Sequence, residues 1–223
     1  MKKNRQLQAL LSNYESSLNA EEYESFVREV TRLQNHYFDI LNSYRAGAER
    51  AQTTQLLIEE QNLQNAHIKT SCQKGCGACC HLEVEITADD ADLLARSILT
   101  NNIPYDKVRL ALQADRPRLD PEWSKGPVTE NRCVMLGADN ACGNYENRPT
   151  ICRKHSVTSP AELCSTLGAS PAPLIVPMNE IILSAALSLD NNEFGSLPKM
   201  LSAAMKRLQP LEEIRALDFE ESP

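Results

Sequence analysis

The sequence predicts a mostly α-helical protein, with an N-terminal helical hairpin, a small irregular cysteine-rich core containing at most two or three short strands, and C-terminal helices. Three observations support this fold class. Residues 1–68 contain one glycine and no proline, so long helices can form there. Residues 69–170 hold all eight cysteines, and residues 171–223 combine prolines with apolar helical stretches. We expect domain boundaries at these two transitions.

The first segment contains a helix-start signal followed by an apolar seam. Asn19 with Glu22 three residues later has the pattern of a capping box. Apolar residues then recur at alternating three- and four-residue steps over three heptads, at Tyr23, Phe26, Val30, Leu33, Tyr37, Ile40 and Tyr44. Gly47 should end this helix, and a second helix is expected over 48–67. The seam could pack within the chain or bind a protein partner or second copy through residues 20–45. Its short length favours packing within the chain.

Capping residues and prolines indicate the later elements. Thr87 with Asp90 should start a helix that ends near residue 99. Ser159 and Glu162 form a second capping-box pattern, with Pro160 at the first helical position, so Cys164 should lie on an amphipathic helix. We also expect helices over 104–114, 177–189, 198–208 and 211–217, a loop over 115–131, short strands near 82–86 and 133–136, and a frayed end at 220–223.

Composition argues against two classes of function. The chain has 30 acidic and 23 basic residues, and this net charge of -7 disfavours non-specific binding to nucleic acid. The longest apolar run, 181–189, is far shorter than the roughly 20 residues that span a bilayer, so no membrane insertion is expected. The N-terminus has no sustained apolar stretch, which indicates a cytosolic protein. In that reducing compartment, eight cysteines are more often metal ligands or catalytic groups than disulfides.

The cysteines fall into two groups with metal-ligand spacing. The first lies in the string SCQKGCGACCH, where Gly75 and Gly77 let the backbone turn around Cys76. The second consists of Cys133, Cys142 and Cys152, with Cys164 twelve residues later. Soft thiolates select zinc, iron or an iron–sulfur cluster over magnesium or calcium. We therefore predict that these cysteines bind a zinc or iron ion, or an iron–sulfur cluster: Cys72, Cys76, Cys79, Cys80, Cys133, Cys142, Cys152 and Cys164. Cys164 could equally be a buried apolar residue. His81 and His155 are possible further ligands.

Basic residues accompany both cysteine groups. Segments 69–81 and 131–155 contain six Lys or Arg and two Asp or Glu, a net charge of +4 in an acidic chain. Arg148 precedes Pro149 and should lie in a turn, and Arg153 directly follows Cys152. We expect both arginines to lie beside the thiolates, where they would donate to sulfur or hold Glu146 and nearby carbonyls.

Two separated motifs resemble a known family. Cys72-x3-Cys76-Gly-x-Cys79-Cys80, followed by Cys142-x2-Tyr-Glu-x-Arg148-Pro-x2-Cys152-Arg, resembles the YkgJ-type cysteine-cluster family, the CxxxCxxCC zinc- or iron-chelating domain. The resemblance covers about residues 70–155 and implies metal chelation. One similar branch, the flagellin lysine N-methylases, suggests an iron–sulfur enzyme that acts on protein lysines.

The sequence contains little independent evidence for catalysis. The spacing of the first three cysteines is also that of radical S-adenosylmethionine enzymes, but the 143 residues after Cys80 show no run of βα units for such a barrel. The chain contains no glycine-rich nucleotide loop and no His-Glu-x-x-His motif. Metal binding without catalysis is therefore the favoured function, and an iron–sulfur enzyme acting on protein lysines is the alternative.

Overall fold

Three helices form the N-terminal part of the computed structural model, which describes residues 5–117, 131–166 and 168–220. They are α1 (Arg5–Glu15), α2 (Ala20–Asn42) and α3 (Ala48–Gln64). Asn19 accepts the N–H of Glu22 and the Glu22 carboxylate accepts the N–H of Asn19, both at 3.0 Å, so the predicted capping box is confirmed. Gly47, at φ 96°, separates α2 from α3 where the break was expected.

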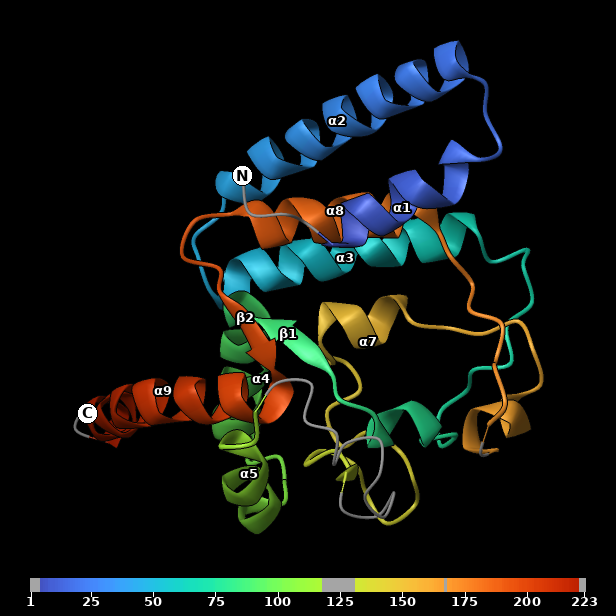
Figure 1. Ribbon diagram of the computed structural model, residues 1–223. Helices are drawn as coiled ribbons and strands as arrows, with labels where there is room; N and C mark the ends of the chain where they lie inside the picture. Colours follow the sequence, from blue (N-terminus) through green and yellow to red (C-terminus); the bar gives the residue numbers. More distant parts are fainter. Residues whose placement is uncertain (1–4, 118–130, 167, 221–223) are drawn as a thin grey trace.

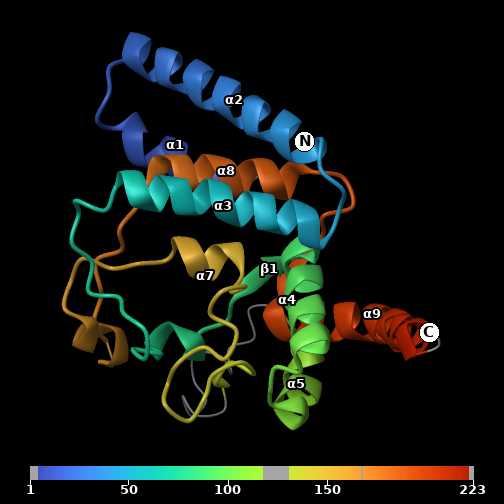
Figure 2. The ribbon, with the colours of Figure 1, turned by 180° about the vertical axis from the view of Figure 1, so that it is seen from behind.

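The apolar seam of α2 packs within the chain. Figures 1 and 2 show α2 lying over α1 and α8 (Pro177–Ser188), with α3 beside α8. Val30 lies against Leu10 of α1 and Ile181 of α8, and Leu41 packs with α8 residues further along. The seam therefore joins the first helices to an element more than 130 residues later. Self-association through residues 20–45 stays a prediction, as do the domain boundaries.

A second group of helices packs beside a two-stranded antiparallel sheet. It consists of α4 (Ala88–Asn101), α5 (Lys107–Ala114) and α9 (Leu197–Glu220). The antiparallel strands β1 (Glu85–Thr87) and β2 (Phe194–Ser196) lie beside it, with Ile86 opposite Gly195. Thr87 caps α4 as predicted, because its Oγ1 accepts the N–H of Asp90 at 3.1 Å. Leu94 and Leu201, at most 1% exposed, lie in the core between α4 and α9.

A buried ion pair fixes α3 on α4. The side chains of Arg50 and Asp89 are each about 5% exposed, and Arg50 Nε lies 2.5 Å from Asp89 Oδ2. Asp89 Oδ1 also accepts the N–H of Gly47 at 2.6 Å. Gly47 has φ 96°, a conformation that residues with a Cβ atom rarely adopt, so glycine is favoured at this crossing. Removing one partner of such a pair leaves a buried charge and typically costs about 3–5 kcal/mol.

The structure confirms the mostly α-helical class with short strands, and three local predictions were wrong. Residues 133–136 form only an isolated bridge, between Leu136 and Cys142, and the second strand lies at Phe194–Ser196 instead. The two helices expected over 198–208 and 211–217 are one helix, α9. A proline inside a helix removes one backbone hydrogen bond and usually kinks or ends it, and α9 nevertheless continues through position 210.

The third error concerns the segment around Cys164. Ser159 does not cap a helix, because its Oγ accepts the N–H of Ala172 at 3.0 Å. Cys164 therefore lies on a short 3₁₀ helix, η3 (Ala161–Ser165), instead of an amphipathic α-helix. The predicted loop over 115–131 and the end at 220–223 fall mostly outside the described residues. Within the described ranges, no helix is both long and apolar enough to cross a membrane.

Candidate metal centre

The first cysteine group lies on a tight loop and one 3₁₀ turn. Cys72 and Cys76 precede η1 (Ala78–His81), which carries the adjacent pair Cys79 and Cys80. Gly77 has φ 55°, and a Cβ atom there would lie 3.0 Å from the carbonyl oxygen of Asn140. The glycine thus allows the loop to turn and to approach the backbone of the second cysteine group. This confirms the predicted role of glycine beside Cys76.

The second cysteine group folds back onto η1. The N–H of Cys133 donates to the carbonyl of Cys80 at 2.7 Å, although the two residues are 53 positions apart. Cys142 forms the isolated bridge with Leu136, and Cys152 lies on the short helix α7 (Thr150–Lys154). The structure therefore brings together cysteines from both sequence groups.

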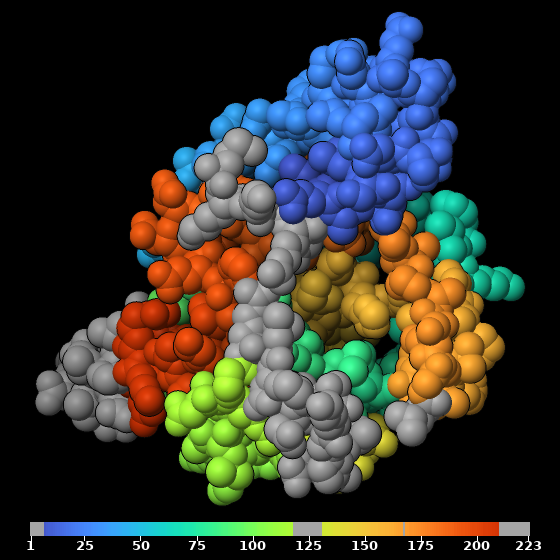
Figure 3. Space-filling view, in the orientation of Figure 1, coloured from blue at the N-terminus to red at the C-terminus, as the bar shows by residue number. Residues whose placement is uncertain are grey.

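One cavity collects most of these thiols. It has a volume of about 400 Å³ and is lined by Cys76, Cys79, Cys80, Cys133, Cys142 and Cys152. Its other walls are largely apolar and come from β1, β2, α8 and α9, through Ile86, Phe194, Leu183 and Leu197. Figure 3 shows the surface hollowed beside α7 on this face of the molecule. Cys72 and Cys164 do not line the cavity.

Thiol groups are suitable ligands for a soft metal, but the sulfur atoms would have to move closer together to bind one ion. All eight cysteines are free thiols. Within the described ranges, no three Cys, His, Asp or Glu side chains converge closely enough to hold a metal ion. In a tetrahedral zinc–thiolate site the Zn–S distance is about 2.3 Å, so neighbouring sulfurs lie about 3.8 Å apart. A metal at this centre would therefore draw the thiols together as it binds.

Burial and hydrogen bonding shift the pKa values of the cysteine thiols in opposite directions. A hydrogen bond from the Cys80 thiol lowers the pKa of Cys79 to about 6, with a smaller contribution from the Arg148 charge, and the same hydrogen bond raises the pKa of Cys80. Burial raises the pKa of Cys133 to about 11 and holds the pKa of Cys152 well above its usual value. The buried thiols therefore stay protonated until a cation offsets the cost of burying their charge.

The two arginines have different surroundings. Arg148 lines the cavity with its guanidinium 4.2 Å from the centre of the Tyr145 ring. Its charge contributes to the lowered pKa of Cys79, and it partly offsets the burial that raises the pKa of Cys142. The Arg148 Nε atom is buried and has no acceptor among the described residues. Arg148 thus lines the same cavity as six of the cysteines.

Arg153 turns toward α3 instead of the sulfurs. Its Nη1 lies 3.3 Å from the carboxylate of Glu59, and its Nη2 donates to the carbonyl of Glu146. Two arrangements were expected for this arginine, a hydrogen bond to sulfur or a contact with Glu146 and nearby carbonyls, and the second is the one found. A role of either arginine in metal binding stays a prediction.

Of the two histidines that could be ligands, His155 lines the cavity, and burial lowers its pKa. The Nδ1 atom of His81 lies 3.2 Å from the carbonyl oxygen of Gly77.

Asp90 positions α7, and sequence reasoning missed this role. Its Oδ1 accepts the N–H of Thr150 at 3.0 Å and the Thr150 hydroxyl at 2.8 Å. Its Oδ2 lies 3.2 Å from the Thr87 hydroxyl, so one carboxyl joins α4 to the start of the helix that carries Cys152. Asp90 is 2% exposed, and burial raises its pKa. Its sequence position indicated only a capping partner of Thr87.

Comparison with known proteins gives one match. Residues 71–169 match the family model described as "CxxCxxCC: Putative zinc- or iron-chelating domain", which covers less than half of the 223-residue chain. Neither the curated proteins nor the solved structures give a match. The matched segment contains both cysteine groups and Cys164, and it ends close to the predicted boundary at 170. Over residues 71–169, this chain is therefore similar to the CxxCxxCC family, described as a putative zinc- or iron-chelating domain.

Proposed function

We propose that this protein binds zinc or iron through its cysteine thiolates. The observation that carries the proposal is that six cysteines from separate stretches of the chain line a single cavity. Five of the six lie on η1 or in the second sequence group, and these two segments meet through the Cys133–Cys80 backbone hydrogen bond. Thiolates are the ligands preferred by zinc, iron and iron–sulfur clusters.

Three features support a bound cation at this place. The buried thiols of Cys133 and Cys152 have raised pKa values, so a nearby cation would stabilise their thiolate forms. Arg148 supplies positive charge that partly balances a thiolate-rich site. The expected cytosolic location would keep the thiols reduced and available. Whether the centre is a single ion or an iron–sulfur cluster is decided by its composition.

The test is anaerobic purification followed by elemental analysis, a visible spectrum and an assay for acid-labile sulfide. Zinc in a colourless protein indicates a zinc site, and iron with sulfide in a brown protein indicates a cluster. Cys76→Ser and Cys152→Ser should each lower the metal content. Thr31→Val, an exposed substitution on α2, is the control and should retain the wild-type content. Full metal content in both cysteine variants, or none in the wild type, would refute the proposal.

The cavity favours a second candidate function, an iron–sulfur enzyme that acts on protein lysines. Lysine has an apolar stem that ends in an ammonium group. The cavity combines apolar walls with acidic side chains beside the cysteines, at Glu83, Glu85 and Asp90, and basic side chains also line it, at Lys74, Arg148 and Lys154. We propose that such a side chain could enter this space and meet the metal centre.

The test compares two peptides that differ only in lysine or norleucine, using the metal-loaded protein and calorimetry. The lysine peptide should bind more tightly, and Leu187→Trp, which fills the cavity wall on the α8 side, should abolish binding at unchanged metal content. Equal affinity for both peptides would count against the enzyme candidate and would leave the metal-binding proposal intact.

A further inference from the structure

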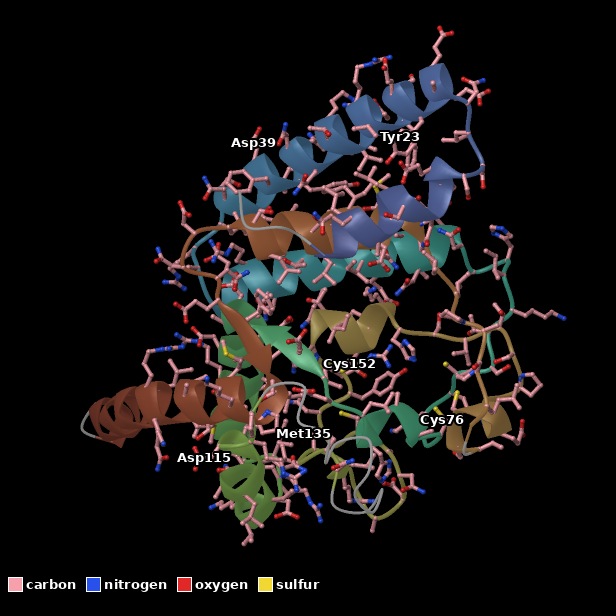
Figure 4. All side chains as sticks on the ribbon, viewed as in Figure 1. Tyr23, Asp39, Cys76, Asp115, Met135 and Cys152 are labelled. Atoms are coloured by element: carbon pink, nitrogen blue, oxygen red, sulfur yellow. The ribbon has the colours of Figure 1, made fainter. Side chains whose placement is uncertain are left out.

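Eight thiols are more than one tetrahedral ion can use. A structural zinc ion takes four ligands, and its sulfur atoms lie within about 3.8 Å of one another. The eight cysteines here occupy two regions that differ in exposure and in neighbouring segments. Figure 4 labels Cys152 on α7 and Cys76 before η1, and they lie apart in this view. The other cysteines can be assigned to an outer region near Cys76 or an inner region near Cys152.

The outer region is built from the first loop and from η3. The helices η1 and η3 contact each other, which brings Cys164 to the loop of Cys72 and Cys76. The Cys72 sulfur accepts the N–H of Val157 at 3.3 Å, so the chain that leads into η3 passes directly beside it. Cys72 interacts electrostatically with three thiols, those of Cys76, Cys79 and Cys164.

Three further observations set this outer region apart. Cys72 and Cys76 are exposed, whereas no cysteine of the other region is. Neither Cys72 nor Cys164 lines the cavity. The spacing Cys72-x3-Cys76-x2-Cys79 is within the two- to four-residue spacing typical of paired zinc ligands on one loop.

The inner region is built from η1, the second cysteine group and α7. Cys133 and Cys142 pack against the main core, as Ile151 does, and Cys133 is bonded through its N–H to the carbonyl of Cys80. Cys80 interacts electrostatically with Cys79, Cys133 and Cys152. Cys79 also interacts with Cys133, Cys142 and Cys152, so it lies where the two regions meet. Cys80, Cys133, Cys142 and Cys152 all line the cavity.

We propose that the chain holds two distinct metal sites, an outer one formed by Cys72, Cys76, Cys79 and Cys164 and an inner one formed by Cys80, Cys133, Cys142 and Cys152. This inference rests on the proposed metal-binding function. The adjacent Cys79 and Cys80 place one ligand in each site, which accounts for the double cysteine. The outer site contains the two exposed cysteines and should exchange its metal readily, whereas the inner site has no exposed cysteine and should release its metal slowly.

The test uses Zn²⁺ as the probe. The full chain is stripped and reloaded anaerobically, its zinc content is measured by elemental analysis, and zinc release to a chelator is followed over time. The wild type should bind two zinc ions per chain and release them in a fast and a slow phase. Cys164→Ser should keep one slowly released ion, and Cys142→Ser should keep one rapidly released ion. Retained helical circular dichroism shows that each variant is folded.

The outcomes separate this inference from the function on which it rests. A wild type that binds one zinc ion, or two that leave in a single phase, overturns the two-site arrangement and leaves metal binding intact. Loss of both ions in the Cys164→Ser variant, with helical circular dichroism retained, also overturns it. A wild type that binds no metal refutes the proposed function itself.

Discussion

The hydrogen bonds between Asp90 and Thr150 can be tested by removing a single hydroxyl. Thr150→Val keeps the shape of the side chain and the backbone N–H bond to Asp90, but it removes the 2.8 Å hydroxyl bond. Both residues are at most 2% exposed, so water cannot replace the lost donor. The substitution also places Val at the first position of α7, immediately before the turn that carries Cys152.

The expected loss can be estimated from these contacts. A buried polar group left without one partner costs about 1–3 kcal/mol. For a chain of this size each kcal/mol lowers the melting temperature by about 2–4 °C, so a decrease of about 2–12 °C is expected. If the two residues also hold Cys152 in place, metal affinity should fall by about 10–100-fold, the usual effect of losing a group that orients a ligand.

The assay combines thermal unfolding of the metal-loaded protein with a chelator competition titration. Thr31→Val is the matched control, because its hydroxyl bonds the carbonyl of Val27 on the exposed face of α2. It should change stability by less than about 0.5 kcal/mol and leave metal affinity unchanged. A Thr150→Val protein with the melting temperature and metal affinity of the wild type would refute the assigned role of Asp90.

Three further perturbations test other parts of the centre. Arg148→Ala and Arg153→Ala should each lower metal affinity by about 10–100-fold in a chelator titration, and wild-type affinity in both would exclude their support of the ligands. Gly77→Ala should lower the melting temperature, since alanine at φ 55° is strained and its Cβ would lie 3.0 Å from a carbonyl oxygen; an unchanged melting temperature would show that the loop can relax. Stripping the metal should expose residues 70–86 and 132–155 to protease, located by mass spectrometry, while helical circular dichroism from the N-terminal helices persists; an unchanged cleavage pattern would argue against coupled ordering.

Local signals predicted much of the helical fold. The capping box at Asn19 and the cap at Thr87 depend on residues three positions apart, so the sequence alone identifies them. Ser159 shows where such signals fail, since its hydroxyl bonds Ala172, a partner outside the local pattern. The strand at Phe194–Ser196 was missed for a similar reason, because it forms by pairing with β1, more than 100 residues earlier.

The cysteines of the candidate site were predictable from their spacing, and their surroundings were not. Residue type and clustering singled out all eight cysteines as candidate ligands, and six of them line the cavity. The Asp90–Thr150 contact joins positions 60 residues apart, and the packing of α2 on α8 spans a longer separation, so neither leaves a local pattern. Arg153 bonds Glu59 because α3 lies alongside α7, an arrangement set by tertiary packing.

The most direct measurement of the central claim is X-ray absorption at the edge of the metal that the purified protein contains. For zinc, thiolate ligation predicts a first shell of about four sulfur atoms at about 2.3 Å per ion. For iron, it predicts a sulfur-dominated first shell, with a second shell of iron if the centre is a cluster. A first shell of oxygen or nitrogen near 2.0–2.1 Å, without sulfur, would contradict binding by the cysteines.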